Sequence, residues 1–135
     1  MTPTTRDAAG GGTVRMKPVA VAARVGAVER EPLPEGMSVA LEVIEGAGLN
    51  RVVHVMRRLV TIGRVEGEIL IDDAMISRRH ASLEVHDFET IILRDLSSTN
   101  GTYHNDQLVA FCKVQDGDEI RLGSTTLTVQ VDVVG

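Results

Sequence analysis

The chain has 135 residues, and its 14 Lys and Arg against 19 Asp and Glu give a formal net charge of −5. This length fits one domain, and hydrophobic residues at 43% with charged residues at 24% are typical of a globular protein with an apolar core rather than of a disordered chain. The acidic balance and the 2% aromatic content argue against a nucleic-acid partner, because binding a polyphosphate backbone needs clustered Lys and Arg, and base stacking needs aromatic side chains.

Residues 1–37 differ in composition from the rest of the chain. All four prolines lie there, together with the run Gly10-Gly11-Gly12, and no hydrophobic period persists. Such a composition is typical of a linker, so we predict a flexible N-terminal tail over residues 1–37 and one domain over residues 38–135. The apolar stretch 19–28 is too short for a membrane span and carries Arg24. We expect it to dock at most weakly, on the domain or on a partner.

From residue 38 onward, apolar and polar residues alternate, which is the period of a half-buried β-strand. The alternation covers residues 39–44, 81–86 and 126–131, and the apolar run Leu59–Ile62 predicts a further strand. Clusters that favour turns separate such runs, at residues 45–48, 65–67, 72–73, 97–101 and 116–118. Because no window shows a helical stripe, the sequence predicts an all-β domain, a β-sandwich or barrel.

Three polar segments carry candidate binding groups, and two of them border predicted strands. Arg64 follows the strand that ends at Ile62. The segment Ser77-Arg78-Arg79-His80 comes directly before the strand that begins at Ala81, and residues 97–102 are a run of small polar side chains. A phosphate monoester brings about −1.5 to −2 charges and is best held by guanidinium groups with hydroxyl and backbone donors beside them. The side chains that supply this set are Arg64, Ser77, Arg78 and Thr99.

The combined motifs resemble those of the forkhead-associated (FHA) domain family, in its order and spacing. They are Ile62-Gly63-Arg64, Ser77-Arg78-Arg79-His80-Ala81, Asp95-Leu96-Ser97-Ser98-Thr99-Asn100-Gly101-Thr102, and Asp116-Gly117-Asp118 with Ile120, Leu122 and Gly123. The resemblance covers roughly residues 38 to 132 and fits a small, single-domain bacterial type of member. It implies a β-sandwich of about eleven strands whose loops at one end bind phosphothreonine peptides without catalysis.

The resemblance also implies a role for each matching residue. Arg64 and Ser77 look like the phosphate ligands, and Arg78 and Thr99 look like further phosphate contacts. Asn100 looks like the clamp on the peptide backbone.

Three more positions look like structural support for this site. Gly63 and His80 match family positions that are mainly structural, and His80 would brace the binding loops from inside. Gly101 would let the turn after Asn100 form. Arg79 has no family role, and we predict a solvated surface charge, with a contact to the peptide as the alternative. The chain departs from the family at Asn105-Asp106, where many members carry Asn-Gly; Asp tolerates a left-handed turn with more strain than Gly.

The tail carries candidate phosphoacceptors, Thr4 and Thr5. Small bacterial members of the family can carry a phosphorylatable Thr in such a tail that folds back into their own site. Thr4 has Asp7 three residues later, an offset that commonly influences selectivity in the family. We hypothesise that the phosphorylated tail competes for the site at the high effective concentration of a tether and switches the adaptor off. The alternative is an unmodified linker.

Other functions find less support in the sequence. A catalytic triad would use Ser77, His80 and Asp95, but Ser77 lacks a Gly-x-Ser-x-Gly elbow. The four histidines show no metal-ligand spacing, Asp116-Gly117-Asp118 is too short for a calcium loop, and the nucleotide-binding glycine motifs do not occur. The single Cys112 can form no internal disulfide, which is typical of a reducing compartment. We predict a cytoplasmic protein that is not an enzyme, with no cofactor, metal or direct membrane insertion.

The sequence thus predicts a phosphothreonine-binding adaptor in Ser/Thr kinase signalling. Its expected partners are phosphothreonine-containing proteins, such as a Ser/Thr kinase or its substrate. The alternative is a scaffold that keeps the FHA fold but binds its partner through a sheet face, without phosphate.

Overall fold

The computed structural model describes residues 31–134, which form eleven β-strands in two sheets and contain no helix. The strands are β1 (Met37–Glu45), β2 (Val52–Val55), β3 (Leu59–Gly63), β4 (Ile69–Leu70), β5 (Ala81–Asp87), β6 (Thr90–Asp95), β7 (Thr102–His104), β8 (Gln107–Val109), β9 (Phe111–Val114), β10 (Glu119–Leu122) and β11 (Thr125–Val133). The predicted all-β class and strand number are confirmed. Thr4, Thr5 and the apolar stretch 19–28 lie outside the described residues.

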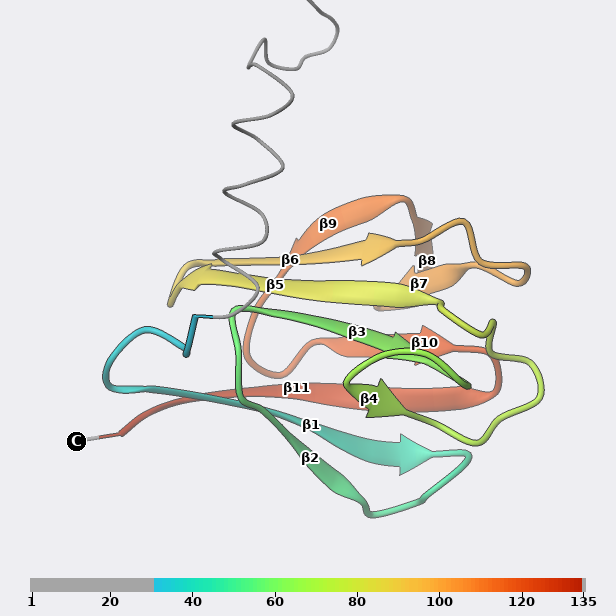
Figure 1. Ribbon diagram of the computed structural model, residues 1–135, viewed down its shortest axis with the longest axis horizontal. Helices are drawn as coiled ribbons and strands as arrows, with labels where there is room; N and C mark the ends of the chain where they lie inside the picture. The colour runs from blue at the N-terminus through green and yellow to red at the C-terminus, as the bar shows by residue number, and fades with distance from the viewer. Residues whose placement is uncertain (1–30, 135) are drawn as a thin grey trace, which may run out of the picture. The chain divides into compact units, whose positions relative to one another are not determined.

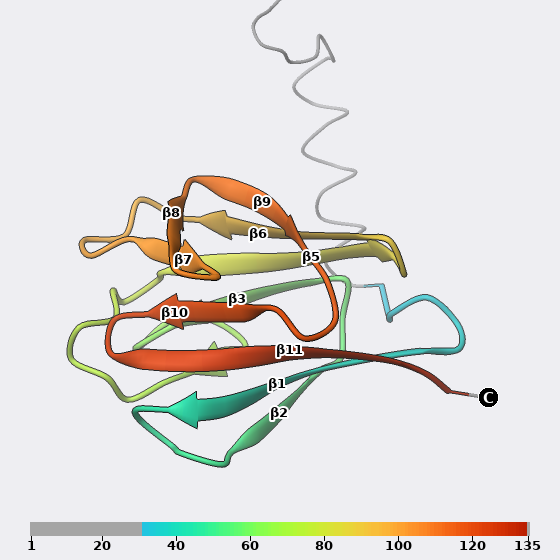
Figure 2. The same ribbon diagram turned by 180° about the vertical axis from the view of Figure 1, so that it is seen from behind.

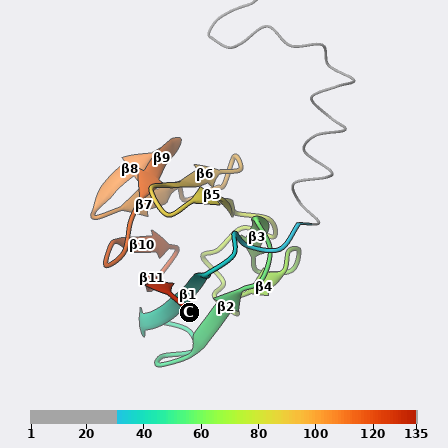
Figure 3. The same ribbon diagram turned by 90° about the vertical axis from the view of Figure 1, so that its left-hand side faces the viewer.

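The two sheets pack face to face as a sandwich, seen from the front in Figure 1 and from behind in Figure 2. One sheet has the order β2-β1-β11-β10-β7-β8, and the other has the order β4-β3-β5-β6-β9. Figure 3 shows the layers from one end, with β7, β10 and β11 on one side and β6, β5 and β3 on the other. Neighbouring strands of residues 31–134 pair antiparallel, except for β3 and β4, which are parallel.

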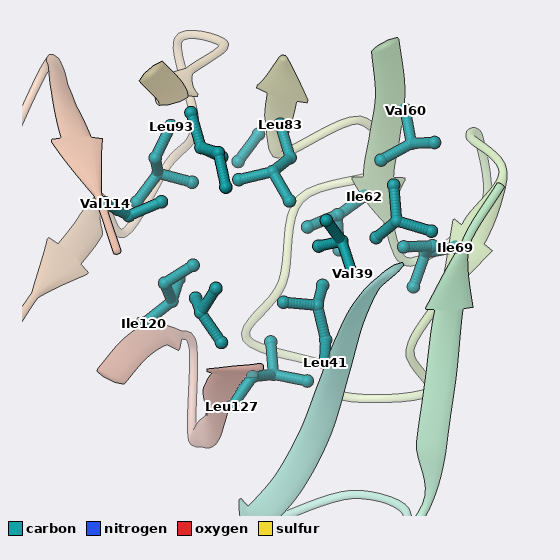
Figure 4. Packing of buried hydrophobic residues seen from close by; sticks show 14 of the residues in the cluster. Val39, Leu41, Val60, Ile62, Ile69, Leu83, Leu93, Val114, Ile120 and Leu127 are labelled. Carbon is teal, nitrogen blue, oxygen red and sulfur yellow. The ribbon is translucent and has the colours of Figure 1, made fainter. Parts of the chain in front are cut away.

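Alternate residues of the strands fill the space between the sheets with aliphatic side chains. Leu41 in β1 is fully buried, whereas its neighbour Glu42 is only half-buried on the outer face. Figure 4 shows Leu41 and Leu127 of one sheet across the core from Leu83 of the other. Burial of each such side chain stabilises the fold by about 1.5–3 kcal/mol. A core of Val, Ile and Leu therefore forms without aromatic rings, and Phe111 remains exposed.

The strand directions bring several loops to one end of the sandwich. β3, β6 and β10 end there, and β5 and β11 begin there, at the right-hand side of Figure 1. The register places Ile62 opposite Ala81 and Ala81 opposite Asp95, so the loops that follow β3 and β6 lie beside the loop that precedes β5. Polar segments far apart in the sequence thus meet at this end.

The hairpin between β7 and β8 forms with the two-residue turn Asn105-Asp106. Both residues lie in the left-handed region, with φ of 46° and 71°. This is the conformation that a type I′ hairpin requires at both central positions. The substitution of Asp for the more usual Gly therefore leaves the hairpin intact, as the tolerance of Asp for left-handed backbone predicts.

Candidate functional site

The loop end of the sandwich carries a hollow of about 430 Å³. Its lining consists of Arg64, residues 74–79, Ser97, Thr99 and Asn100. The hollow therefore brings together the five residues that the resemblance assigns to phosphopeptide binding: Arg64, Ser77, Arg78, Thr99 and Asn100. Arg79, for which the sequence predicts a solvated charge, is exposed and lines the same hollow.

Arg64 directly follows β3 and is held by hydrogen bonds to the segment before β5. Its backbone N–H donates to the carbonyl of Ser77 at 2.9 Å, and its Nε donates to the carbonyl of Ile76 at 3.0 Å. These bonds fix the stem of the side chain and leave the two terminal nitrogens for a ligand. Within residues 31–134, no carboxylate lies at ion-pair distance from Arg64. Its guanidinium can therefore bind a phosphate without first breaking an ion pair to any carboxylate of these residues.

Gly63 allows the loop after β3 to approach the segment that carries Arg78. A Cβ at this position would overlap the carbonyl oxygens of Arg78 and Glu66. The Arg78 carbonyl accepts the N–H groups of Val65 at 3.1 Å and Glu66 at 2.8 Å. Close backbone packing, rather than a left-handed turn, therefore explains glycine at this position.

Hydrogen bonds connect the two polar loops across the hollow. The Oγ of Ser77 accepts the backbone N–H of Thr99 at 2.9 Å, so its own hydroxyl hydrogen is available to a ligand. The Nδ2 of Asn100 donates to the carbonyl of Met75 at 2.8 Å. That bond orients the amide and leaves its Oδ1 as an acceptor for a peptide N–H.

His80 lies beneath the hollow with no exposed surface. Its Nδ1 accepts the backbone N–H of Ser77 at 3.0 Å, and Nε2 therefore carries the hydrogen that it shares with the carbonyl of Gly101 at 2.9 Å. The ring joins the Ser77 segment to the Gly101 turn. Since both nitrogens bond to backbone groups, neither is available as a base for the Ser77 hydroxyl.

Asp95 closes the loop that carries Thr99. Its carboxylate accepts the N–H and the hydroxyl of Ser98 and the hydroxyl of Thr102. The hydroxyl of Ser98 also accepts the N–H of Gly101, whose φ is +88°. Burial opposes the ionisation of Asp95, but these hydrogen bonds outweigh it and lower the pKa of the carboxyl. Asp95 belongs to a family motif, but the sequence suggests a role for it only in the disfavoured triad, whereas the structure makes it a support of the loop.

Other features of the site cannot be recognised from the sequence. The carbonyls of Met75 and Ile76 orient Asn100 and Arg64, but any residue supplies a carbonyl. Ser97 lines the hollow and has a φ of 59°. This left-handed conformation is uncommon for Ser, so the sequence does not predict it. The pair Asp72-Asp73 is typical of a turn, although the structure buries Asp73.

The hollow has a positive rim. Arg64, Arg78 and Arg79 line it, and Glu66 pairs with Arg78 through Oε2 and Nη2 at 3.6 Å. Both partners of this pair are more than half exposed. The arrangement offers guanidinium, hydroxyl and backbone donors to a dianionic group, with an amide beside them for the main chain that carries it.

A family model described as FHA domain matches residues 60–123. The chain is 36% identical over 98 residues to an oxoglutarate dehydrogenase inhibitor of Corynebacterium glutamicum, a match that covers 72% of this chain and 67% of that protein. The chain belongs to the FHA domain family. A solved FHA structure from a structural and functional analysis of phosphothreonine-dependent FHA domain interactions is 34% identical, with a TM-score of 0.61 over 69% of this chain and 95% of that one.

Other relatives of this FHA domain are longer. The FHA domain-containing protein FhaA of Mycobacterium tuberculosis is 34% identical over 97 residues, which are 71% of this chain and 18% of FhaA. The glycogen accumulation regulator GarA of the same organism is 33% identical over 98 residues, 72% of this chain and 59% of GarA. The names of two of these relatives, inhibitor and regulator, suggest roles other than catalysis.

The described part of the FHA domain offers neither a metal cluster nor a helical membrane span. Residues 31–134 contain no group of three or more His, Cys, Asp and Glu side chains placed to hold a metal ion. No helix with the length and apolarity to cross a membrane occurs in the same residues.

Proposed function

We propose that this FHA domain is an adaptor that binds phosphothreonine in partner proteins of Ser/Thr kinase signalling. The observation that carries the proposal is the convergence of Arg64, Ser77, Arg78, Thr99 and Asn100 on one hollow. The structure related to phosphothreonine-dependent interactions, at 34% identity, supports the same ligand class. The expected partner is a Ser/Thr kinase or its substrate.

Recognition follows from the donors around the hollow. The guanidinium groups of Arg64 and Arg78 bind the phosphate with charge-assisted hydrogen bonds, and the hydroxyl of Ser77 adds a further donor. Thr99 contributes a contact on the opposite loop, and the Oδ1 of Asn100 accepts a main-chain N–H of the peptide. Loops held by a rigid sandwich keep these groups in place before the ligand arrives.

We infer that the domain binds its ligand without transforming it. His80 does not act as a base for the hydroxyl of Ser77, because both of its ring nitrogens bond to backbone groups. Asp95, the third residue of a possible triad, bonds to Ser98 and Thr102 instead. We place the activity in the cytoplasm, where kinases have the ATP that forms phosphothreonine.

We further propose that the tail regulates the site. Phosphorylation of Thr4 or Thr5 would create a tethered ligand for the hollow, which excludes external phosphopeptides. The support is the sequence alone, a Thr-rich segment with Asp7 three residues after Thr4. Mass spectrometry after kinase treatment tests the modification, and its absence from residues 1–13 would refute the switch.

Calorimetric titration of the full chain tests the proposed function. The ligands are degenerate peptide pools centred on phosphothreonine, phosphoserine or unmodified Thr, and a peptide of residues 1–13 phosphorylated at Thr4. We expect micromolar or tighter binding confined to phosphothreonine. Since each hydrogen bond to a charged group contributes about 1.5–3 kcal/mol, Arg64→Ala should weaken binding at least about tenfold.

Each outcome separates the alternatives. Loss of binding in the folded Arg64→Ala variant supports the proposed site, and unchanged affinity removes Arg64 from it. Binding of the phosphorylated tail peptide supports self-inhibition. Equal or absent binding of all pools would favour a phosphate-independent scaffold instead.

A further inference from the structure

Asp73 lies in the segment between β4 and β5 and is 8% exposed, although its side chain bears a charge. We propose that Asp73 is a positioning residue for phosphopeptide binding, which acts through the carbonyl of Met75 on Asn100. The inference rests on the proposed function of the hollow. It assigns to the site a residue that does not line it and that the motifs do not include.

The carboxylate of Asp73 joins its own loop to the turn between β10 and β11. Oδ1 accepts the N–H of Met75 at 2.8 Å. Oδ2 accepts the N–H of Ser124 at 2.9 Å and the hydroxyl of Thr125 at 2.7 Å. One carboxylate thus holds two segments that lie more than fifty residues apart in the sequence.

The loop that Asp73 holds supplies the carbonyls that orient two ligand-binding side chains. The carbonyl of Met75 accepts the Nδ2 of Asn100 at 2.8 Å. The backbone carbonyl of Asp73 accepts the N–H of Ile76 at 2.9 Å, and the carbonyl of Ile76 accepts the Nε of Arg64 at 3.0 Å. The connection from the Asp73 carboxylate to Asn100 is more direct than the connection to Arg64. Met75 alone makes it, because its N–H donates to Asp73 and its carbonyl accepts the Nδ2 of Asn100.

Close packing makes this arrangement stiff. Gly123, with a φ of +58°, allows the β10–β11 turn to approach Met75 and Ile76, since a Cβ there would lie only 3.0 Å from atoms of both residues. The hydroxyl of Thr125 also accepts the N–H of Ala47, which adds the β1–β2 loop to the cluster. The segment of Met75 and Ile76, which lines the hollow, is therefore packed against a fixed β10–β11 turn.

The charge of Asp73 persists at neutral pH. Burial opposes ionisation, but the hydrogen bonds from Met75, Thr125 and Ser124 outweigh it and lower the pKa of the carboxyl. An uncharged amide in its place could accept fewer of these bonds and would turn N–H donors toward other donors. Asp73→Asn should therefore release the Met75 segment while changing little of the side-chain volume.

A matched control lies at the other end of the sandwich. Asp118 precedes β10, accepts the N–H of Gln115 at 3.0 Å and bonds to the ring of His104 at 2.7 Å. The pKa of its carboxyl is lowered in the same way, against the effect of burial. Asp118→Asn removes a comparable structural carboxylate that has no route to the hollow.

The experiment measures phosphopeptide affinity and thermal unfolding of the full chain, with the phosphothreonine peptide pool of the titration above as the ligand. Both variants should lower Tm. Asp73→Asn should weaken binding about tenfold and Asp118→Asn less than about twofold, because only the former disturbs Asn100. The side-chain amide signals of Asn100 in NMR spectra should shift only in Asp73→Asn.

A double-mutant cycle distinguishes positioning from general support of the fold. In an Asn100→Ala background, the effect of Asp73→Asn on affinity should fall below about threefold, while its effect on Tm persists. An undiminished loss of affinity in that background, or wild-type affinity of Asp73→Asn alone, would overturn the proposal. If Asp73→Asn does not fold, Thr125→Val removes one anchor of the carboxylate and should show the same coupling. Failure of the wild-type chain to bind any phosphothreonine peptide would instead refute the proposed function, and the positioning role with it.

Discussion

Arg78 and Glu66 form an ion pair at the rim of the hollow, with Nη2 and Oε2 3.6 Å apart and both side chains more than half exposed. Arg64, in the same hollow, has no such partner among residues 31–134. Before a phosphate binds, the guanidinium of Arg78 is therefore paired with a carboxylate, whereas that of Arg64 is not paired with any carboxylate of residues 31–134. A phosphate that binds Arg78 must compete with Glu66 and approach its negative charge.

Glu66→Gln should consequently raise phosphopeptide affinity. An exposed ion pair contributes at most about 1 kcal/mol, so the gain should be about two- to fivefold. The backbone N–H of Glu66 still bonds to the Arg78 carbonyl in the variant, so the loop remains in place. Titration at two salt concentrations measures the effect, with Glu89→Gln in the β5–β6 turn as a charge-matched control. Equal gains in the two variants would indicate a change in overall charge rather than release of Arg78.

Gly63 provides a second prediction, because its Cβ would overlap two backbone carbonyls rather than a flexible side chain. Gly63→Ala should lower the free energy of unfolding by about 1–3 kcal/mol, as overpacking does in other cores. It should also weaken phosphopeptide binding, since Arg64 and Arg78 flank the overlap.

Gly117→Ala is the control for this variant. A Cβ at Gly117 would meet no atom within 4 Å, but the φ of this residue is +89°, so its substitution strains only the backbone. We expect a loss of about 1 kcal/mol in unfolding free energy and unchanged affinity. Urea unfolding and titration of both variants check the pair, and equal affinity losses would show that the overlap at Gly63 is not transmitted to the site.

The elements that the sequence predicts are those with a sustained pattern. Alternation over residues 39–44, 81–86 and 126–131 corresponds to β1, β5 and β11, and the apolar run from Leu59 corresponds to β3. β4 has only two residues, and a strand of that length shows no period. Short strands such as β7 and β8 depend on their neighbours in the sheet, which the sequence does not specify.

In the site, the sequence predicts the side chains but not the backbone groups that orient them. Motifs predict which side chains matter, and the structure places Arg64 and Asn100 in one hollow. The carbonyls that orient them have no side-chain signature. The burial of Asp73 could not be predicted either, because its partners Ser124 and Thr125 come close only after the two sheets have packed.

Asp106 offers a test of the departure from the usual Asn-Gly turn. Its φ of 71° is left-handed, a conformation that costs an L-residue energy and glycine almost none. Asp106→Gly should therefore raise the unfolding free energy by about 0.5–1 kcal/mol. Thermal unfolding measures the gain, and Asp106→Ala, which keeps the strain and loses the short polar side chain, should be destabilising. A less stable Asp106→Gly variant would mean that contacts of the Asp side chain outweigh the backbone strain.

Acid should destabilise the domain through three carboxyls that hydrogen bonds keep ionised. The pKa values of Asp73, Asp95 and Asp118 are lowered, because bonds from neighbouring N–H and hydroxyl groups, and from His104, outweigh the opposing effect of burial. In the unfolded chain their pKa returns to about 3.9. As the pH falls past that value, the unfolded state therefore binds protons before the folded state does, and folding loses stability.

The stabilisation from these groups is complete above about pH 5 and disappears as the pH falls through the lower pKa values of the folded state. Urea unfolding between about pH 5 and about pH 2.5 should show a free energy of unfolding that decreases with falling pH. Asp118→Asn removes one of the three groups, so its curve should start lower and fall less steeply. Parallel curves for the wild type and the variant would contradict the role of Asp118, and a flat wild-type curve would contradict all three.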